Sequence, residues 1–302
     1  MEIVKLKPAT KDYIWGGKKL KKMGKEAPYD NIAECWELSF NEAGPSIIAS
    51  GDNEGKALKD VATKEELGKA CSKFPFFPVL IKLIDSDSNL SVQVHPSDEY
   101  ALKNENQLGK TEMWYVIDAE PGAGLYVGFK KETTPEEVRK KIEDGSIMEI
   151  LNFFEVKPGE TYFIPSGTIH AIGKGVTVIE IQQNSTLTYR LYDYKRKDKN
   201  GNERELHVDK ALKVLNFTPY KALSFEKPLI GECEYFSSYE YDVKGNEHVK
   251  ASPNSFASIT FIEGEGVFAG ISYRKGDTFF IPTNKEGRIE GTGKYIFTEV
   301  KA

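Results

Sequence analysis

The chain has 302 residues, 39% of them apolar, so it can bury a substantial core in one large domain or two medium ones. Its net charge of −5 arises from interspersed basic and acidic residues, which excludes the basic footprint of a nucleic-acid-binding protein and the polybasic patch of a membrane-binding one. A small neutral or anionic ligand would therefore be attracted by local groups and not by the field of the whole molecule.

Short runs of aromatic and β-branched residues, separated by glycine, proline and asparagine, follow one another along most of the chain. These runs predict strands at residues 78–84, 90–94, 113–117, 124–128, 161–164, 176–182, 256–262, 278–281 and 294–300. Strand signals at such close spacing are typical of an all-β barrel or sandwich.

Helical patterning is confined to a few segments. Residues 58–74 and 134–152 read as amphipathic helices, the second beginning with a Thr-Pro-Glu-Glu cap. A third candidate, residues 208–215, follows the charged loop KRKDKNGNERE at residues 195–205. Because that loop has the composition of an exposed boundary, we expect an N-terminal domain at residues 1–205, including the helical elements, and a C-terminal domain at 206–302.

An internal repeat relates the two parts of the chain. The sequence KPGETYFIPS at residues 157–166 recurs as RKGDTFFIPT at residues 274–283, a displacement of 274 − 157 = 117 residues. Each copy contains a glycine turn, an aromatic strand and a proline, which predicts two β-barrel units of common ancestry. The position that corresponds to His170 is Gly287, since 170 + 117 = 287. If the first barrel holds a metal, the second has lost that ligand.

Two polar residues share one face of a predicted strand. Gln93 and His95 are two residues apart, so their side chains point the same way and can enter a barrel together. A single histidine on a strand can equally be a packed, hydrogen-bonded residue. Here, however, Glu112 precedes an apolar strand, and His170 ends the sequence Gly-x5-Pro-x-Gly-x2-His at residues 159–170, which matches the second motif of the cupin barrel.

Four segments together resemble a known family. They are QVHP at 93–96, GKTEMWYV at 109–116, PSGTIHAIG at 165–173 and TYRLYDY at 188–194. In order and spacing they are similar to the type I phosphomannose isomerases, particularly the short microbial form, over nearly the whole chain. The resemblance implies a mainly β fold of two cupin-type jelly-roll barrels with a few peripheral helices, in which the N-terminal domain is catalytic and the C-terminal cupin has no metal ligands.

The resemblance also implies one zinc ion per chain. Its ligands would be Gln93, His95, Glu112 and His170, with glutamine in place of the first histidine that a cupin usually offers. Two imidazoles, a carboxylate and an amide oxygen suit a borderline divalent ion and leave room for water or substrate. The ligand types alone also admit iron.

The implied reaction is the reversible conversion of mannose 6-phosphate to fructose 6-phosphate. It requires a base beside the carbonyl and a cation that stabilises the enediolate. Lys110 lies two residues before Glu112 and so shares its face in an extended segment. The family commonly assigns catalysis to this lysine, although a solvated loop lysine is the alternative. Arg190 matches an active-site arginine of the family, and its planar donor fork suits sugar oxygens, although a structural ion pair would also explain it.

Substrate binding is the expected role of three further residues. Lys82, in the apolar run PVLIKLID, could bind phosphate or extend its amine to the surface. Ser88 and Ser91 are candidates for the phosphate side by analogy with the family. Glu180 could face the barrel, or be a paired structural residue, and the sequence does not identify a ring-opening group. His207 and His248 read as surface histidines.

Other functions keep the fold and change the chemistry. The alternatives are another metal-dependent cupin enzyme, such as a dioxygenase or a sugar-nucleotide epimerase, and a non-catalytic module that binds sugar phosphate. A dioxygenase would prefer iron and an apolar pocket, whereas clustered Lys82, Lys110 and Arg190 suit an anionic sugar. The glycines at 263–266 and 291–293 lie between strands without a following helix, so they are turn residues and not a nucleotide site.

Location follows from the cysteines and from the absence of export signals. The three cysteines are far apart and form no Cys-x-x-Cys pattern, so a disulfide framework is not expected. The sequence has no apolar run near the roughly 18 residues that span a bilayer, and no apolar signal core near residue 1. We expect a cytoplasmic protein whose partner is a hexose 6-phosphate, with no nucleic acid or membrane partner; the oligomeric state is left open.

Overall fold

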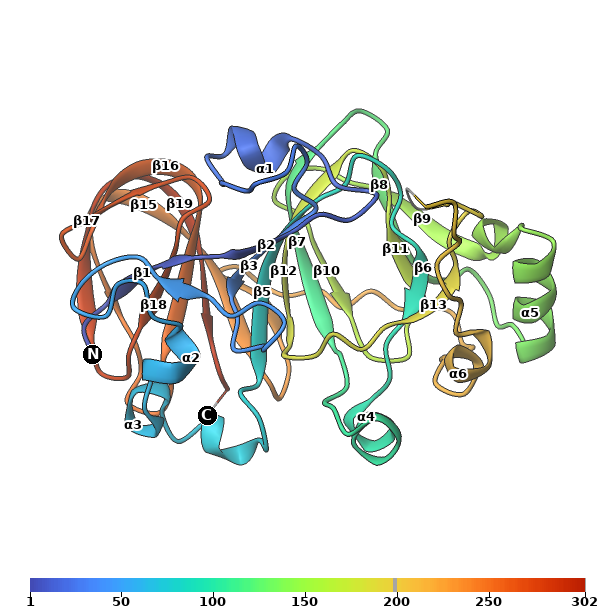
Figure 1. Ribbon diagram of the computed structural model, residues 1–302, viewed down its shortest axis with the longest axis horizontal. Coiled ribbons are helices and arrows are strands. Elements are labelled where there is room, and N and C mark those ends of the chain that lie inside the picture. Colours follow the sequence, from blue (N-terminus) through green and yellow to red (C-terminus); the bar gives the residue numbers. More distant parts are fainter. Residues whose placement is uncertain (198–199, 302) are drawn as a thin grey trace. The chain divides into compact units, whose positions relative to one another are not determined.

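Residues 1–197 and 200–301 are described by a computed structural model of the chain (Figure 1). Strands predominate and the helices are short, which confirms the predicted mainly β class. Contacts within the chain define two units. Unit 1 contains residues 1–11, 19–83 and 224–301, and unit 2 contains residues 12–18 and 84–223.

The units do not follow the order of the predicted domains. The expected boundary between residues 205 and 206 lies inside unit 2, and residues 19–83 group with the C-terminal strands in unit 1. Units of mutual contact are not a test of domain ancestry or function, so the division into 1–205 and 206–302 stays a prediction. Within the charged loop at 195–205, residues 198–199 lie outside the described residues, as does residue 302.

Unit 2 contains the predicted metal ligands and is built from two antiparallel groups of strands. One group has β7 between β10 and β12, and the other has the order β13, β6, β11, β8, β9. The strands are β6 Val92–Val94, β7 Glu112–Ala119, β8 Gly124–Phe129, β9 Leu151–Glu155, β10 Thr161–Ile164, β11 His170–Ile172, β12 Val176–Gln183 and β13 Tyr189–Tyr192. Both β7 and β12 are buried along most of their length, so polar side chains on them are placed in the interior.

Short helices lie between or after the strands of unit 2 along the chain. These are α4 Asp98–Glu105, α5 Pro135–Glu143, the 3-10 helix η2 Ile147–Ile150, and α6 Val208–Leu212. Val138, Ile142 and Ala211 on these helices join a buried apolar cluster with Val92 and Leu191 of the strands. The cluster fixes the strands that carry the predicted site.

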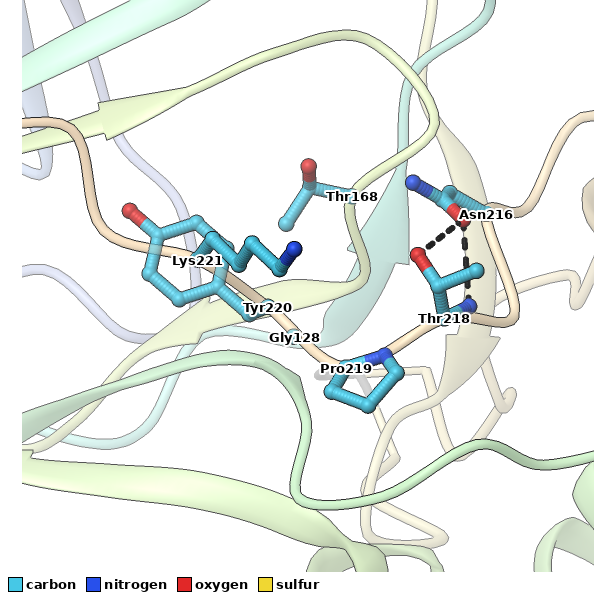
Figure 2. A pocket seen from close by; sticks show the side chains of 7 residues that line it. All are labelled: Gly128, Thr168, Asn216, Thr218, Pro219, Tyr220 and Lys221. Atoms are coloured by element: carbon cyan, nitrogen blue, oxygen red, sulfur yellow. Dashed lines mark hydrogen bonds between the residues drawn. The ribbon is translucent and has the colours of Figure 1, made fainter.

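A surface cavity of about 390 Å³ is also part of unit 2 (Figure 2). It is lined by Gly128, Thr168, Asn216, Thr218, Pro219, Tyr220 and Lys221. The side-chain oxygen of Asn216 accepts hydrogen bonds from the backbone N–H and hydroxyl of Thr218. No predicted site residue lines this cavity, so the expected chemistry must be sought elsewhere in the unit.

Unit 1 contains a large sheet with the order β14, β15, β19, β16, β18, β1, β4, in which β17 pairs with β16. The strands of unit 1 are β1 Val4–Lys7, β2 Ala9–Lys11, β3 Glu34–Leu38, β4 Ile47–Ile48, β14 Leu229–Glu232, β15 Ser237–Lys250, β16 Ala257–Phe268, β17 Ile271–Arg274, β18 Thr278–Ile281 and β19 Glu286–Glu299, together with most of β5 Val79–Asp85. All of them except β2, β3 and β5 belong to the large sheet. Aromatic side chains fill its core, among them Phe261, Phe268 and Phe279.

The internal repeat has the same local structure in both copies. Gly159 has φ of +92° and precedes β10, while Gly276 has φ of +94° and precedes β18. Each strand that follows has four residues. A positive φ favours glycine because a side chain would be strained there, which explains why the turn is repeated with its glycine.

The single helix predicted at residues 58–74 is wrong. The segment forms α2 Leu58–Val61, α3 Lys64–Leu67 and the 3-10 helix η1 Cys71–Lys73. Thr63 begins α3 with a capping box that includes Glu66, and Gly68 ends it with φ of +87°. The amphipathic period runs through residues 58–74, but the cap at Thr63 and the turn at Gly68 divide the segment into short helices.

Two other helices are shorter than predicted, and one was not predicted. The segment 134–152 ends its helix at Glu143, shortly before Gly145 with φ of +78°, and continues as η2 and β9. The segment 208–215 is helical only to Leu212. Helix α4 was missed because its apolar residues, 100–102, are consecutive and form no stripe along one face; Ser97 caps its first turn. Among the described residues, no helix is both long and apolar enough to cross a membrane.

Candidate functional site

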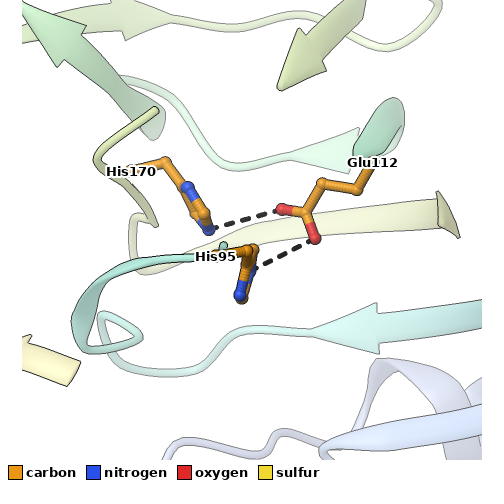
Figure 3. A group of neighbouring side chains, drawn as sticks. All are labelled: His95, Glu112 and His170. Atoms are coloured by element: carbon orange, nitrogen blue, oxygen red, sulfur yellow. Dashed lines mark ion pairs between the residues drawn. The ribbon is translucent and has the colours of Figure 1, made fainter. Parts of the chain in front are cut away.

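Three predicted ligands converge inside unit 2 (Figure 3). Nε2 of His95 lies 3.5 Å from one carboxylate oxygen of Glu112, and Nε2 of His170 lies 3.3 Å from the other. All three residues are at most 1% exposed. One donor atom from each lies within 4.8 Å of the others, and within the described part of the chain no other group of histidine, cysteine and acidic residues has this property.

Backbone carbonyls fix the orientation of both imidazoles. Nδ1 of His95 donates to the carbonyl of Leu187, and Nδ1 of His170 donates to the carbonyl of Thr168, each over 2.9 Å. This tautomer leaves the lone pair of each Nε2 directed at the cluster, as in metal-binding histidines. Burial lowers the pKa of His170 to about 4, so this imidazole is neutral at pH 7 and available as a donor.

Gln93 reaches the cluster from the strand next to His170. Its side-chain nitrogen lies 3.3 Å from Nε2 of His170. Rotation of the amide by 180° would direct its oxygen to the same place. The strand pairing explains the proximity, since Gln93 of β6 is the register partner of His170 of β11 on one side and of Arg190 of β13 on the other. Directly opposed residues of antiparallel strands point to the same face.

A glycine lets the segment before Glu112 approach α4. A Cβ on Gly109 would lie 2.5 Å from the backbone at Ser97 and Asp98. The N–H of Gly109 donates to the carboxylate of Asp98, and the N–H of Lys110 donates to the carbonyl of Pro96. This close approach brings Lys110 to His95, which is only one residue from Pro96.

Lys110 lies in the interior with the cluster. Its Nζ is 2.6 Å from the carboxylate of Glu112, 3.2 Å from Nε2 of His95 and 3.7 Å from the carboxylate of Glu180. Only 4% of Lys110 is exposed. The other oxygen of Glu180 accepts a hydrogen bond from the indole of Trp114. The sequence therefore placed Lys110 on the correct face, and the solvated alternative is wrong.

Arg190 forms part of an arginine-rich group beside the cluster. Its Nε donates to the hydroxyl of Ser91 over 3.3 Å. Arg196 donates to the hydroxyl of Ser88 over 3.2 Å. Burial, followed by the charge of nearby Arg204, lowers the pKa of Arg190 from its ordinary value. Ser88 and Ser91, which were predicted on the phosphate side, thus lie at two arginines of one unit.

Lys82 belongs to unit 1. It is buried, with Nζ 3.7 Å from the carboxylate of Glu34 and 5.5 Å from the centroid of the Trp36 ring. The alternative in which its amine extends to the surface is therefore wrong. Its role in phosphate binding stays a prediction.

Several polar residues lie at or beside the site although the sequence analysis assigned them no role there. Glu180 and Gln182 are the register partners of Trp114 and Glu112, so they face the cluster from β12. The alternation of polar residues in VTVIEIQQ was the available signal. His207 was assigned to the surface, but its Nδ1 accepts a hydrogen bond from the N–H of Arg190 over 3.2 Å. No local pattern could reveal that contact, because a loop separates the two residues.

The donor set fits a divalent metal. Two imidazole nitrogens, one buried carboxylate and an amide converge from β7, β11 and the β6 segment. Mixed nitrogen and oxygen donors of this kind suit zinc and other first-row ions. Their deep burial would also strengthen any charge interaction with a substrate. The arrangement can hold a cation beside one buried amine, Lys110, and one guanidinium, Arg190.

Comparison with known proteins gives matches over nearly the whole chain. Residues 3–121 match the family described as phosphomannose isomerase type I, catalytic domain, and residues 227–300 match mannose-6-phosphate isomerase, cupin domain. The chain is 38% identical to mannose-6-phosphate isomerase ManA of Bacillus subtilis, covering 97% of this chain and 98% of the relative. It is 35% identical to mannose-6-phosphate isomerase of Streptococcus mutans, covering 92% of both.

Solved structures give the same result. The crystal structure of mannose 6-phosphate isomerase from Bacillus subtilis matches with a TM-score of 0.88 and 35% identity over 99% of each chain. A putative mannosephosphate isomerase from Archaeoglobus fulgidus matches with a TM-score of 0.84 and 27% identity, over 99% of this chain and 98% of the other. These matches confirm the predicted cupin fold and the resemblance inferred from the four sequence segments.

Proposed function

Because this chain belongs to the type I phosphomannose isomerase family, we propose that it interconverts mannose 6-phosphate and fructose 6-phosphate and that this reaction takes place at the cluster of His95, Glu112 and His170. One observation carries this proposal. A buried amine, that of Lys110, lies 2.6 Å from the carboxylate of the only described group able to hold a metal. A metal site and a base are the two parts that aldose–ketose isomerisation needs.

We propose one zinc ion per chain, held by Gln93, His95, Glu112 and His170. The lone pairs of both Nε2 atoms and the carboxylate oxygens already face one another, which supports this set. When bound, the cation would supply Lewis-acid stabilisation of negative charge on the sugar oxygens. The protein holds both imidazoles in the required tautomer through the carbonyls of Leu187 and Thr168.

Lys110 is the proposed base. Proton transfer between C1 and C2 of the sugar requires a group that takes a proton from one carbon and returns it to the other. Nζ of Lys110 can do this because it lies beside the proposed ligands and is buried. Glu180 provides a second carboxylate, 3.7 Å from Nζ, which is not among the proposed ligands and can retain the amine in the site.

Arg190 is the proposed second catalytic group. As the register partner of Gln93, it lies on the same face as the proposed ligands and can orient sugar oxygens there. Its contact with Ser91 and the contact of Arg196 with Ser88 support a phosphate-binding side in this direction. Lys82 stays a proposed phosphate contact on the strength of the family resemblance.

A coupled assay tests the function. Purified protein is assayed with mannose 6-phosphate, fructose 6-phosphate and glucose 6-phosphate, with and without chelator, and its metal content is determined. We expect conversion of the first two, loss of turnover with chelator and recovery on addition of zinc. Binding of hexose phosphate without turnover would favour the non-catalytic alternative, and oxygen consumption with bound iron would favour a dioxygenase.

A cytoplasmic location is also proposed. The three cysteines are all free thiols in the structure, which is compatible with a reducing compartment. Fractionation of cells that express the full chain tests this location.

A further inference from the structure

His207 contacts the backbone of Arg190 from two directions. Nδ1 of His207 accepts a hydrogen bond from the N–H of Arg190 over 3.2 Å. In return, the N–H of His207 donates to the carbonyl of Arg190 over 2.7 Å. Both polar groups of the Arg190 backbone are therefore bound by one residue, as they would be by a neighbouring strand.

The segment before His207 also holds the guanidinium. Nη1 of Arg190 donates to the carbonyl of Glu205 over 2.9 Å, while Nε is held by Ser91. Backbone and side chain of Arg190 are thus fixed by the same short stretch, residues 205–207. An arginine has several rotatable bonds, and fixing them before substrate binds reduces the entropy lost on binding.

A buried carboxylate, that of Asp193, pairs with arginines at both ends of the charged loop and so brings residues 205–207 close to Arg190. Asp193 is 4% exposed and accepts hydrogen bonds from Nε and Nη2 of Arg204 over 2.7 and 2.6 Å, and from Arg196. Burial alone would raise the pKa of Asp193, but the hydrogen bonds from Arg204 and Arg196 outweigh it, and the pKa is lowered. The carboxylate stays charged at neutral pH and ties both ends of the charged loop, so the stretch that follows it reaches Arg190.

His207 occupies the N-cap position of α6 but does not cap the helix with its side chain. Its carbonyl accepts the first helical hydrogen bond, from Ala211. Serine, threonine, asparagine and aspartate cap helices well, whereas histidine is not among the preferred residues. The ring is instead directed at Arg190, which indicates a role for His207 other than helix capping.

The contact exists only in one protonation state. A backbone N–H can only donate, so Nδ1 must carry a lone pair and the proton must be on Nε2. Four charged groups face the ring: Glu205 of the loop, Glu105 of α4, Arg190 of β13 and Lys210 of α6. Burial is the largest influence and lowers the pKa of His207, which keeps the ring neutral at pH 7.

We propose that His207 is a positioning residue for Arg190, and that protonation of its ring releases the arginine and lowers isomerase activity at acidic pH. This inference rests on the proposed role of Arg190 in catalysis. The direction follows from the lone pair: as pH falls through the pKa of His207, which is below the ordinary value of 6.5, both ring nitrogens become donors and the N–H of Arg190 loses its acceptor.

Two substitutions separate the hydrogen bond from the rest of the side chain. In His207→Asn the amide oxygen can replace Nδ1 as an acceptor but does not titrate, whereas His207→Leu removes the acceptor. His248→Leu is the matched control, because His248 is 64% exposed at its side chain and pairs with Glu286 in unit 1. All variants are checked for folding by thermal melting.

The first measurement is steady-state kinetics with mannose 6-phosphate from pH 5 to 8. We expect His207→Leu to lower kcat/KM roughly tenfold, the factor for one neutral hydrogen bond. His207→Asn should restore most of this loss and should keep its activity to lower pH than the wild type. The control should follow the wild-type profile.

The second measurement needs neither substrate nor metal. The protection factor of the Arg190 amide against hydrogen exchange, which is corrected for the intrinsic pH dependence of exchange, should fall in the metal-free His207→Leu protein, and in the metal-free wild type only at acidic pH. Unchanged exchange and an unchanged pH profile in a folded His207→Leu would overturn the inference, as would an Asn variant no better than Leu. A wild-type protein without isomerase activity would instead overturn the proposed function, and the exchange result would still report whether His207 holds Arg190.

Discussion

The repeated turn and strand occur once in each unit, and their surroundings differ. In unit 2, β10 pairs with β7, and the register places Ile164 opposite Glu112, a proposed ligand. In unit 1, β18 pairs with β16 and faces aromatic side chains, with the rings of Phe279 and Phe268 5.3 Å apart in an edge-to-face arrangement. The repeated motif thus determines a backbone geometry, while the residues on neighbouring strands determine whether that geometry holds a reactive site or a core.

The two interiors are stabilised by different physical terms. In unit 1, burial of Phe261, Phe268, Phe279 and Tyr273 gains the hydrophobic free energy of large aromatic side chains. In unit 2, the interior contains Lys110 and Glu112, whose burial costs desolvation energy that their attraction only partly offsets. We infer that the aromatic core around Phe261 mainly contributes stability, whereas the interior around Lys110 and Glu112 retains costly groups because the proposed reaction needs them.

The strongest test of this comparison copies the unit 1 residue into unit 2. His170→Gly gives unit 2 the residue that stands at the corresponding position, Gly287. One proposed ligand and its fixed lone pair are lost, so we expect loss of bound metal and a fall in kcat/KM of at least about 10³-fold. Metal analysis and the coupled assay measure both effects.

Loss of folding could mimic this result, so a second variant accompanies it. His170→Gln keeps a polar side chain of similar length and should fold with lower metal content. A folded His170→Gly protein with wild-type metal content and turnover would break the comparison, since both units would then work with glycine at this position.

The next largest effect is expected from Lys110→Met. Methionine keeps much of the volume of the lysine stem but removes the amine, so the proposed base is lost while the ligands remain. We expect kcat to fall by about 10²- to 10⁴-fold with metal content near that of wild type. Exposed Lys103 in the same unit offers the control Lys103→Met, which should change neither quantity. Retained turnover in Lys110→Met would discard the assignment.

A substitution in the aromatic core of unit 1 should affect stability alone. Phe279 is 0% exposed, and Phe279→Ala should lower the free energy of unfolding by about 3–5 kcal/mol, because a large cavity replaces the ring. Urea unfolding measures this loss, and the milder Phe279→Leu keeps the test valid if the alanine variant does not fold. Kinetic constants per folded molecule should stay at wild-type values; a selective loss of kcat would show that the aromatic core of unit 1 contributes to the chemistry.

Many of the strands could be predicted from local sequence patterns, although β15 was not, and the proposed ligand set was implied by the family resemblance. Alternation placed Gln93 and His95 on one face, and the same two-residue argument placed Lys110 beside Glu112. Helix lengths were less accessible. At residues 58–74 the apolar period was present, but the capping box at Thr63 and the positive φ of Gly68 interrupted it.

Residues that support the site could not be predicted in the same way. His207 reaches Arg190 because Asp193 binds Arg196 and Arg204 and so closes the charged loop between them. The sequence of this loop has the composition of an exposed boundary, and nothing local shows that Arg196 and Arg204 meet a single buried carboxylate. Contacts between distant residues depend on tertiary packing, which periodicity does not encode.

The smallest expected effect comes from the reverse exchange, Gly287→His in unit 1. A Cβ at this position would lie 2.6 Å from the ring of Phe268 and 2.8 Å from Cδ1 of Ile3, so the new imidazole would enter a filled core. Overpacking of this kind typically costs about 1–3 kcal/mol, which urea unfolding can measure. No metal should bind at the new histidine, because one imidazole in a hydrocarbon core has no other donors to complete a site. An additional equivalent of zinc in metal analysis would show that unit 1 kept hidden ligands, and that its interior differs from that of unit 2 by a single residue.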